Sequence, residues 1–236
     1  MARCIWLAAL ALALALWTGA AAIPGSASRG VAGCSSTGYA YAGIMGATAV
    51  AGIEATLTAA AAPGVRSGHV AGWVGVGGPG AGPRGANEWL QAGLSSLADG
   101  SVRLYYELVG PGITRRYVDL GGVAVGRPVR LAVLEIPTRP SWWRVWVGTR
   151  PAGKPIRLVA SDHRLLPVAT AESWRPSTAA PACNTFAYRF LRVRTVARRG
   201  GPFSSFVAAW TLHDAPYTVA RRSDGFVARS SGLTDT

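Results

Sequence analysis

The sequence predicts an all-β protein, an antiparallel β-sandwich of two curved sheets. From about residue 37 onward, short apolar or alternating runs follow one another at intervals of roughly ten residues, separated by glycine and proline. Few stretches show helical periodicity. Of the 236 residues, 50% are hydrophobic and only 15% are charged, with 30 glycines and 15 prolines. This composition excludes a disordered polar chain or a coiled coil, and a chain of this length can bury the core of one domain.

The first element, residues 1–27, is expected to be a secretory signal peptide. Arg3 precedes an apolar run rich in alanine, which is too short for a membrane span, and small residues allow cleavage after Ala22 or after Ala27. We therefore expect an exported protein, secreted or associated with the cell envelope, with no transmembrane segment after signal cleavage. A short segment at 28–38 would lead into a single β domain at 39–236.

The expected strands are the apolar or alternating runs between turn signals. In chain order they are Tyr39–Ile44, Gly52–Leu57, Val70–Val76, Glu88–Leu94, Val102–Leu108, Arg116–Leu120, Pro128–Ile136, Trp142–Thr149, Ile156–Val159, Val168–Trp174, Phe186–Val196, Phe203–Thr211 and Val219–Arg221. Between the strands, glycines can adopt positive φ and prolines cannot donate to a ladder, so both residue types indicate turns. The expected turns are Gly77-Gly78-Pro79-Gly80, Gly110-Pro111-Gly112, Gly121-Gly122, Pro151-Ala152-Gly153 and Gly200-Gly201-Pro202.

Alternation assigns faces in two of these runs. In the run 102–108, the apolar face carries Val102, Leu104, Tyr106 and Leu108, and the opposite face carries Arg103, Tyr105 and Glu107. In the run 142–147, the face of Trp143, Val145 and Val147 opposes the face of Trp142, Arg144 and Trp146. A Trp-Arg-Trp face fits either Arg144 stacked between aromatic rings on the outside of the sandwich or a ligand groove. In the second case, Trp142 and Trp146 would bind substrate.

Cysteine and histidine usage gives no sign of a metal or a cofactor. Cys34 and Cys183 remain after removal of the leader, and in an exported chain they form either one disulfide or two unpaired buried thiols. His69, His163 and His213 occur singly, and no pair of cysteines has metal-ligand spacing. We expect His69 and His163 to lie on the surface or in a polar core.

The formal net charge is +13, from 24 Lys and Arg against 11 Asp and Glu. Arginines gather at Arg189, Arg192 and Arg194 and again at 198–199 and 221–222. Phosphate binding is one use of such charge. However, no recognised nucleic-acid motif is present, so an anionic cell-wall polymer or envelope surface is the favoured partner and nucleic acid is not expected.

Four segments occur in a characteristic order. They are Ala71-Gly72-Trp73-Val74-Gly75-Val76-Gly77-Gly78, Trp89-Leu90-Gln91-Ala92-Gly93, Tyr105-Tyr106-Glu107-Leu108 and Thr170-Ala171-Glu172-Ser173-Trp174. Together they resemble the glutamic peptidases of the G1 (eqolisin) family, and the chain looks like a divergent, bacterial-type member. The resemblance runs from about Tyr41 to Arg229.

The resemblance implies a sandwich of the concanavalin A-like or lectin-like type, with the active site on a concave face. Gln91 and Glu172 take the places of the family's catalytic Gln and Glu. Glu107, Tyr105 and Trp73 would lie beside them and contact a polypeptide substrate. Leu90 and Ala92 point away from the side of Gln91 in an extended strand, so Gln91 and Glu172 can reach one face of a sheet.

These residue types suit peptide hydrolysis without a metal, cofactor, Ser or Cys nucleophile. A carboxylate such as Glu172 can take a proton from water and pass it to the leaving amine. A neutral amide such as Gln91 can donate hydrogen bonds to the developing oxyanion. Because an ordinary Glu has a pKa of about 4.3, the expected activity is that of a secreted endopeptidase with an acidic optimum.

The sequence also departs from the family pattern. Gly77 stands where the family has Asp, and the Trp of an early substrate-facing strand has no counterpart in Glu54-Ala55-Thr56-Leu57. The segment after the catalytic Glu is shortened to Glu172-Ser173-Trp174-Arg175-Pro176.

Other roles for these residues stay open. Gln91 could pair with the backbone of a strand, Glu172 could form a salt bridge with Arg175 or another arginine, and Glu107 could be an ordinary paired carboxylate. The alternative function is a non-catalytic, lectin-like binding module on the same sandwich, which would bind a cell-wall glycan or a peptide.

Overall fold

The computed structural model describes residues 37–160, 165–176, 182–231 and 233. The expected signal peptide and Cys34 lie outside these residues, so export and the Cys34–Cys183 pairing stay predictions. Within the described ranges, none of the helices has the length and apolar character needed to cross a membrane.

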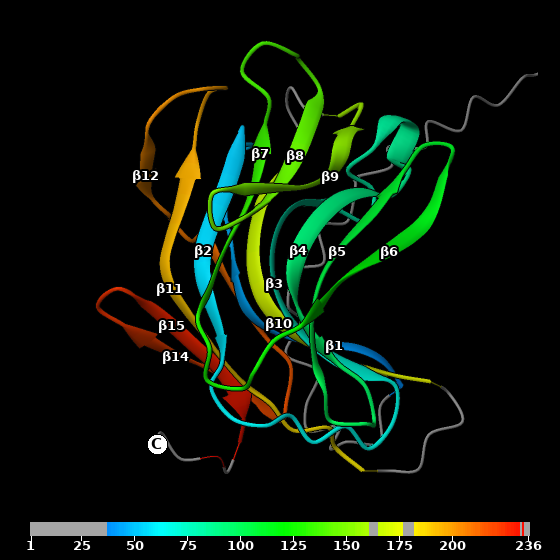
Figure 1. The fold of residues 1–236 in the computed structure, drawn as a ribbon, viewed down its shortest axis with the longest axis vertical. Coiled ribbons are helices and arrows are strands. Elements are labelled where there is room, and N and C mark those ends of the chain that lie inside the picture. Colours follow the sequence, from blue (N-terminus) through cyan, green and yellow to red (C-terminus); the bar gives the residue numbers. More distant parts are fainter. Residues whose placement is uncertain (1–36, 161–164, 177–181, 232, 234–236) are drawn as a thin grey trace, which may run out of the picture.

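Seven strands form one antiparallel sheet, in the order β13-β1-β10-β3-β4-β5-β6 (Figure 1). Their bounds are β1 Gly38–Met45, β3 His69–Gly78, β4 Glu88–Ser96, β5 Val102–Gly110, β6 Ile113–Gly122, β10 Pro167–Arg175 and β13 Trp210–His213. A short 3-10 turn, η1 (Pro83–Gly85), precedes β4. This seven-stranded sheet carries the motif residues.

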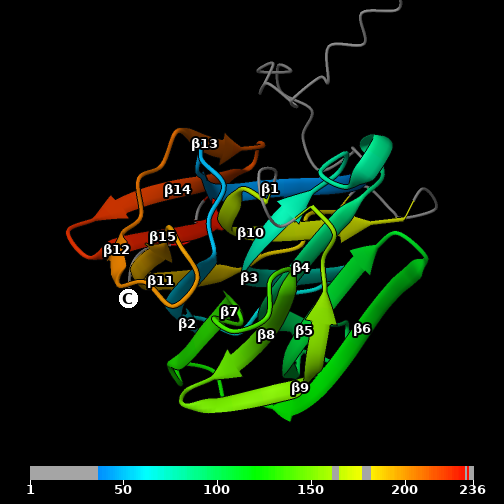
Figure 2. The same cartoon turned by 90° about the horizontal axis from the view of Figure 1, so that it is seen from above.

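Eight strands form the second antiparallel sheet, in the order β14-β15-β11-β2-β7-β8-β9, and β12 pairs with β11. Their bounds are β2 Gly52–Ala59, β7 Val129–Glu135, β8 Trp142–Val147, β9 Arg150–Arg157, β11 Ala187–Val196, β12 Phe203–Ser205, β14 Tyr217–Arg222 and β15 Gly225–Ser230. Figure 2 shows the end of this sheet formed by β7, β8 and β9 beside β4, β5 and β6. The predicted fold class, an antiparallel β-sandwich, is confirmed.

The core lies between the inner faces of the two sheets. Its largest fully buried side chains include Trp143, Tyr188, Phe190 and Phe226 from the eight-stranded sheet and Leu90 from β4. The face assignments from alternation are correct, because the predicted apolar residues of 102–108 belong to this core and the opposite residues face away. Burial of one face of each sheet accounts for the period of two in the sequence.

The observed strand bounds differ from the expected ones at many ends, and two of the expected turns lie inside strands. Strand β9 begins at Arg150 rather than at Ile156, so the expected turn Pro151-Ala152-Gly153 lies inside a strand. β9 is the last strand of its sheet, where proline is tolerated, and Gly153 has a φ of 72° beside an irregular register with β8. The expected turn Gly121-Gly122 also lies inside a strand, at the end of β6.

The expected strand Phe203–Thr211 is two strands that belong to different sheets. β12 pairs with β11, whereas β13 pairs with β1. Strand β15 was not predicted; it follows β14 across the two-residue loop Ser223-Asp224, and its first residue is Gly225. An Asp-Gly step between alternating runs is a hairpin signal.

The seven-stranded sheet is strongly curved. Arg115 of β6 lies over the ring of Tyr39 of β1, with its Cζ atom 5.8 Å from the ring centre. In a flat sheet β1 and β6 would be about 24 Å apart, since five steps of about 4.8 Å separate them. The face that carries both side chains, which is the face turned away from the core, is therefore concave.

Candidate active site

The strand registers place the motif residues on the concave face. Glu172 of β10 pairs with Ala71 of β3, and Gln91 of β4 pairs with Gly75 of β3. Trp73 lies between Ala71 and Gly75 on the same face of β3. Glu172 and Gln91 are thus two strands apart, about 10 Å across the sheet, and offset by four residues, about 13 Å along β3, with Trp73 between them.

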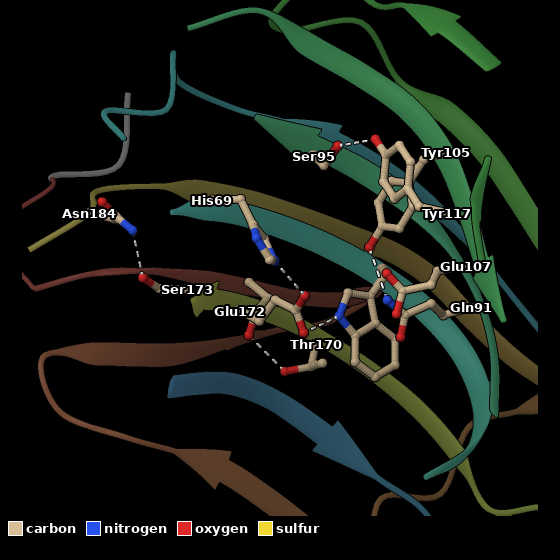
Figure 3. Close-up of polar contacts among 12 residues, drawn as sticks. His69, Gln91, Ser95, Tyr105, Glu107, Tyr117, Thr170, Glu172, Ser173 and Asn184 are labelled. Atoms are coloured by element: carbon tan, nitrogen blue, oxygen red, sulfur yellow. Dashed lines mark hydrogen bonds and ion pairs between the residues drawn. The ribbon is translucent and has the colours of Figure 1, made fainter. Parts of the chain in front are cut away.

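Strands β5 and β6 continue this face. Gln91 pairs with Glu107, and Glu107 pairs with Tyr117. Figure 3 shows Glu172, Gln91 and Glu107 on one side of the sheet, with Tyr105 and Tyr117 beside Gln91. The structure therefore brings Gln91, Glu172 and the predicted neighbours Trp73, Tyr105 and Glu107 together.

Two glycines make room for these large side chains. A Cβ atom at Gly75 would stand 2.9 Å from Cβ of Gln91, and one at Gly93 would stand 2.7 Å from Cβ of Trp73. Real Cβ atoms essentially never come this close, so a side chain at either glycine would displace Gln91 or Trp73. The glycines of the motifs thus fix the floor of the site.

Glu172 accepts its contacts from two side chains of β3. The indole Nε1 of Trp73 donates to Oε2 at 2.9 Å, and Nε2 of His69 lies 3.4 Å from Oε1. The ring of His69 is stacked on Trp174, with ring centres 5.5 Å apart. Glu172 is 4% exposed. A nearly buried carboxylate is therefore held by one neutral donor and one ionisable ring.

Gln91 is oriented by the tyrosines of β5 and β6. Its Nε2 donates to the hydroxyl of Tyr105 at 3.2 Å, and Tyr105 is stacked on Tyr117 with ring centres 4.9 Å apart. The hydroxyl of Tyr117 in turn lies 2.8 Å from Oγ of Ser95. The amide nitrogen of Gln91 is thus fixed, and it has a second hydrogen to donate.

All five glutamates of the chain are buried, and they differ in what balances their charge. Glu54 binds two arginines, Glu107 accepts from Arg115 at 2.8 Å, and Glu135 has Arg199 at 3.9 Å. Glu88 accepts the backbone N–H groups of two residues, Val159 and Ala160. Within the described ranges, Glu172 pairs with neither Arg nor Lys. The alternative of a salt bridge from Glu172 to an arginine is therefore not seen, whereas Glu107 is a paired carboxylate.

An aromatic wall borders Glu172 on the side of β1. Tyr41 pairs with Glu172 and Tyr39 with Trp174 in the ladder of β1 and β10. The rings of Tyr39 and Tyr41 are stacked, with centres 5.8 Å apart. Such a wall beside a carboxylate offers contact area for the apolar side chains of a ligand.

Burial and the charges of the glutamates in the site raise the pKa values of the phenols beside them. Burial raises the pKa of Tyr105 well above its ordinary value, and the charges of Glu172 and then of Glu107 raise it further. The pKa of Tyr41 is also raised, by burial first and by Glu172 second. Both phenols therefore stay neutral and able to hydrogen-bond over the pH range in which the carboxylates ionise.

Trp142 and Trp146 do not join this site. They lie on β8 of the other sheet, on the face turned away from the core, because Trp143 and Val145 fill the inner face. The guanidinium over Trp142 belongs to Arg139, with Cζ 4.0 Å from the ring centre. A substrate that contacts Gln91 and Glu172 cannot reach these tryptophans through the core.

Two departures from the family pattern receive a structural account. Gly77 has a φ of 88°, and a Cβ atom there would collide with the carbonyl oxygen of Glu88, so the chain excludes Asp at this position. The stretch 54–57 lies in β2 of the eight-stranded sheet and does not face the site. The aromatic residues of the strand beside Glu172 are Tyr39 and Tyr41 of β1.

Sequence reasoning missed His69 and Arg115 as site residues. His69 was expected on the surface or in a polar core, but it lies two positions before Ala71 on the face of β3 that carries Trp73. Its place four residues before Trp73 in an alternating strand was the signal. Arg115 had no signal in its own strand, since its contact with Tyr39 depends on the curvature of the whole sheet.

No group of three or more His, Cys, Asp or Glu side chains that could hold a metal ion occurs in the part of the chain that the structure describes. Cys183 is described, but its expected partner Cys34 is not. The polar groups of the site are thus carboxylate, amide, imidazole, indole and phenol.

The solved structures whose folds are similar to this chain include glutamic peptidases. A crystal structure of scytalido-glutamic peptidase with a peptide-based transition state analogue is 16% identical, with a TM-score of 0.54, over 82% of this chain and 98% of that chain. SCP-B, a member of the eqolisin family of peptidases in complex with the tripeptide Ala-Ile-His, is 14% identical, with a TM-score of 0.50 and the same coverage. No family model and no curated protein matches the sequence. The likeness therefore shows the fold.

Proposed function

We propose that this protein is an acid endopeptidase that hydrolyses peptide bonds with Glu172 as general base and acid and Gln91 as oxyanion donor. The observation that carries the proposal is the state of Glu172. It is nearly buried on a concave face, and among the described residues no arginine or lysine balances it. A buried carboxylate held by an indole N–H and an ionisable imidazole, without a permanently charged partner, is typical of sites that use the proton.

In the proposed reaction, a peptide lies across the concave face with its scissile carbonyl between Gln91 and Glu172. Glu172 takes a proton from a water molecule as that water attacks the carbonyl carbon. The Nε2 group of Gln91, which Tyr105 holds in place, donates to the oxygen on which negative charge develops. Glu172 then passes the proton to the leaving amine, and the C–N bond breaks.

The supporting side chains have distinct tasks. Trp73 fixes one oxygen of Glu172 by its indole N–H. His69, beside the other oxygen, adds a positive charge when it is protonated. The stacked rings of Tyr39 and Tyr41 border the position of the substrate next to Glu172. Export rests on the signal peptide expected at residues 1–27.

The test is an assay of the purified protein without residues 1–27 on unfolded casein and a peptide library, at a pH of about 2 to 5, since the ordinary pKa of Glu is about 4.3. We expect cleavage by the wild type and none by Glu172→Gln. Gln91→Ala should lose a factor of about 10² to 10³ in kcat, as expected for one oxyanion donor.

The matched control is Glu107→Gln, which changes a carboxylate that Arg115 already balances. This variant should retain far more activity than Glu172→Gln. Absence of cleavage by the wild type over the whole range would reject the peptidase, and binding of a glycan or peptide without cleavage would support the binding module instead. Cleavage that survives both Glu172→Gln and Gln91→Ala would reject the site.

A further inference from the structure

A second polar pocket lies on the outer face of the eight-stranded sheet, away from the candidate active site. It has a volume of about 160 Å³ and is lined by Glu54, Ala55, Thr56, Arg130, Arg192 and Arg194. The residues come from β2, β7 and β11, which are neighbours in the sheet. Three arginines and one glutamate leave two positive charges in excess at this place.

Glu54 holds two of the arginines in fixed positions. Its side chain is 3% exposed; Nε and Nη2 of Arg130 donate to Oε2 at 3.1 and 2.6 Å. Nε of Arg194 donates to Oε1 at 2.8 Å, with Nη2 of Arg194 bonded to the same oxygen. Each guanidinium uses one side for Glu54, so its remaining N–H groups are directed elsewhere.

Arg194 is held from another side as well. Its Cζ atom lies 5.0 Å from the centre of the Phe203 ring, in strand β12, which pairs with β11 beside it. A guanidinium fixed by a carboxylate and an aromatic ring loses little further freedom when it binds an anion.

A β-bulge in β11 contains the third arginine of the pocket, Arg192, and sets the side of the sheet on which Arg194 lies. The register of β11 with β2 shifts between Leu191 and Arg194, so three steps on β11 match two on β2. In a regular strand, Arg194 and Leu191 are three residues apart and would point to opposite faces of the sheet. The extra residue of the bulge puts Arg194 on the same face as Leu191, which pairs with Thr56. Arg192, inside the bulge, has a φ of 52°, which a non-glycine residue rarely adopts.

This strained residue has no part in balancing Glu54, because Arg130 and Arg194 already do so. Strained backbone positions cluster at functional sites, and here the strained residue adds a third guanidinium to a pocket that already has a positive excess. We propose that this pocket is a binding site for a phosphate group, whose charge matches the excess and whose oxygens match guanidinium forks.

The size of the pocket agrees with this ligand. Its volume of about 160 Å³ leaves room for a group larger than a single water molecule, and a phosphate group is such a group. Inorganic phosphate, a phospholipid headgroup and a phosphodiester polymer share this chemistry, so the experiment must distinguish them.

The test is a calorimetric titration of the full-length mature protein with inorganic phosphate at low salt. We expect one phosphate bound per chain and an affinity at least tenfold weaker in Arg192→Asn, since Asn tolerates positive φ and keeps the backbone. The matched control is Arg189→Asn, an arginine of the same strand that is exposed but outside the pocket. It should bind phosphate like the wild type, and all three proteins should melt at the same temperature.

Two further arms identify the source of the phosphate. Retention on phosphatidylglycerol vesicles or on poly(glycerol phosphate) that is lost in Arg192→Asn but not in Arg189→Asn would assign the site to that material. Retention that is equal in both variants, with phosphate binding still lost in Arg192→Asn, would assign it to free phosphate. No saturable phosphate binding, or equal weakening by both substitutions, would overturn the proposal.

Discussion

The hydrogen bond from Trp73 to Glu172 is the shortest contact that the structure gives to the candidate catalytic carboxylate. An indole N–H donates but does not accept, so it favours the carboxylate over the carboxylic acid and holds one oxygen in place. The other oxygen faces His69. The geometry of Glu172 therefore depends on side chains of a neighbouring strand rather than on its own.

Replacement of Trp73 by Phe should lower the rate of peptide cleavage. The ring is kept, but the hydrogen bond to Glu172 is lost, and hydrogen bonds to charged groups contribute about 1.5–3 kcal/mol. The expected loss in kcat/KM is roughly 10- to 100-fold. The measurement is the cleavage rate of a fluorogenic peptide at acidic pH.

Trp89→Phe is the control for this substitution. It removes an indole N–H that lies 3.4 Å from Glu107, a carboxylate already bound to Arg115. A loss in Trp89→Phe as large as in Trp73→Phe would show that the effect comes from ring packing and not from the bond to Glu172.

Single residues of the site were partly predictable. The motif order indicated Gln91 and Glu172, and strand alternation put Tyr105 and Glu107 on one face, because both follow from local sequence. Trp142 and Trp146 were equally good candidates by local pattern. Only the pairing of β8 with β7 and β9, which is set by contacts between distant segments, assigns them to the outer face of the other sheet.

Among the elements, β3 shows how a strand serves both the core and the site. Its outward residues His69 and Trp73 hold Glu172, whereas its inward face packs against the eight-stranded sheet. Gly72 belongs to the inward face, where a Cβ atom would stand 2.6 Å from Cγ of Tyr188. The close approach of β3 to Tyr188 thus needs a glycine.

Gly72→Ala should destabilise the protein by about 1–3 kcal/mol, because an added methyl group in a packed core forces side chains or backbone to move. Gly78→Ala, in the same strand, should change the free energy of unfolding little, since a Cβ atom there meets nothing within 4 Å. Denaturant unfolding of both variants measures this. Equal stability of the two would contradict the packing of Tyr188 against Gly72.

The strands were predictable where hydrophobic alternation is strong and less so at sheet edges. β5 and β8 have clear alternation and were found with the correct faces. β9 is an edge strand in which proline and glycine are tolerated, so its turn signals were misleading. The bulge of β11 depends on its pairing with β2, and the change of sheet between β12 and β13 depends on β11 and β1, so neither is encoded in local pattern.

At the scale of the whole molecule, buried phenols link the site to the core. Of seven tyrosines, six have a raised pKa, with burial as the first cause in each. They are Tyr39, Tyr41, Tyr105, Tyr117, Tyr188 and Tyr217. The folded state therefore prefers these phenols in the protonated form.

This preference predicts a loss of stability in alkali. A phenol whose pKa is higher in the folded state than in the unfolded state contributes stability that is present below pH 10 and is lost as the pH rises further. We expect phenolate absorbance and loss of β-sheet circular dichroism to rise together above pH 10. Ionisation of most tyrosines near pH 10 in a protein that keeps its fold would contradict the burial.

The contact between Arg115 and Tyr39 joins strands near opposite margins of the curved sheet, across its concave face. A cation–π contact of this kind is worth roughly 0.5–2 kcal/mol, so thermal motion opens it often. Under the proposed peptidase function, an extended chain would pass this contact toward Glu172 and Gln91 more readily than a folded domain, which has no slack segment to insert. Selection for unfolded polypeptide thus would begin at the entrance, before any side chain of the substrate is recognised.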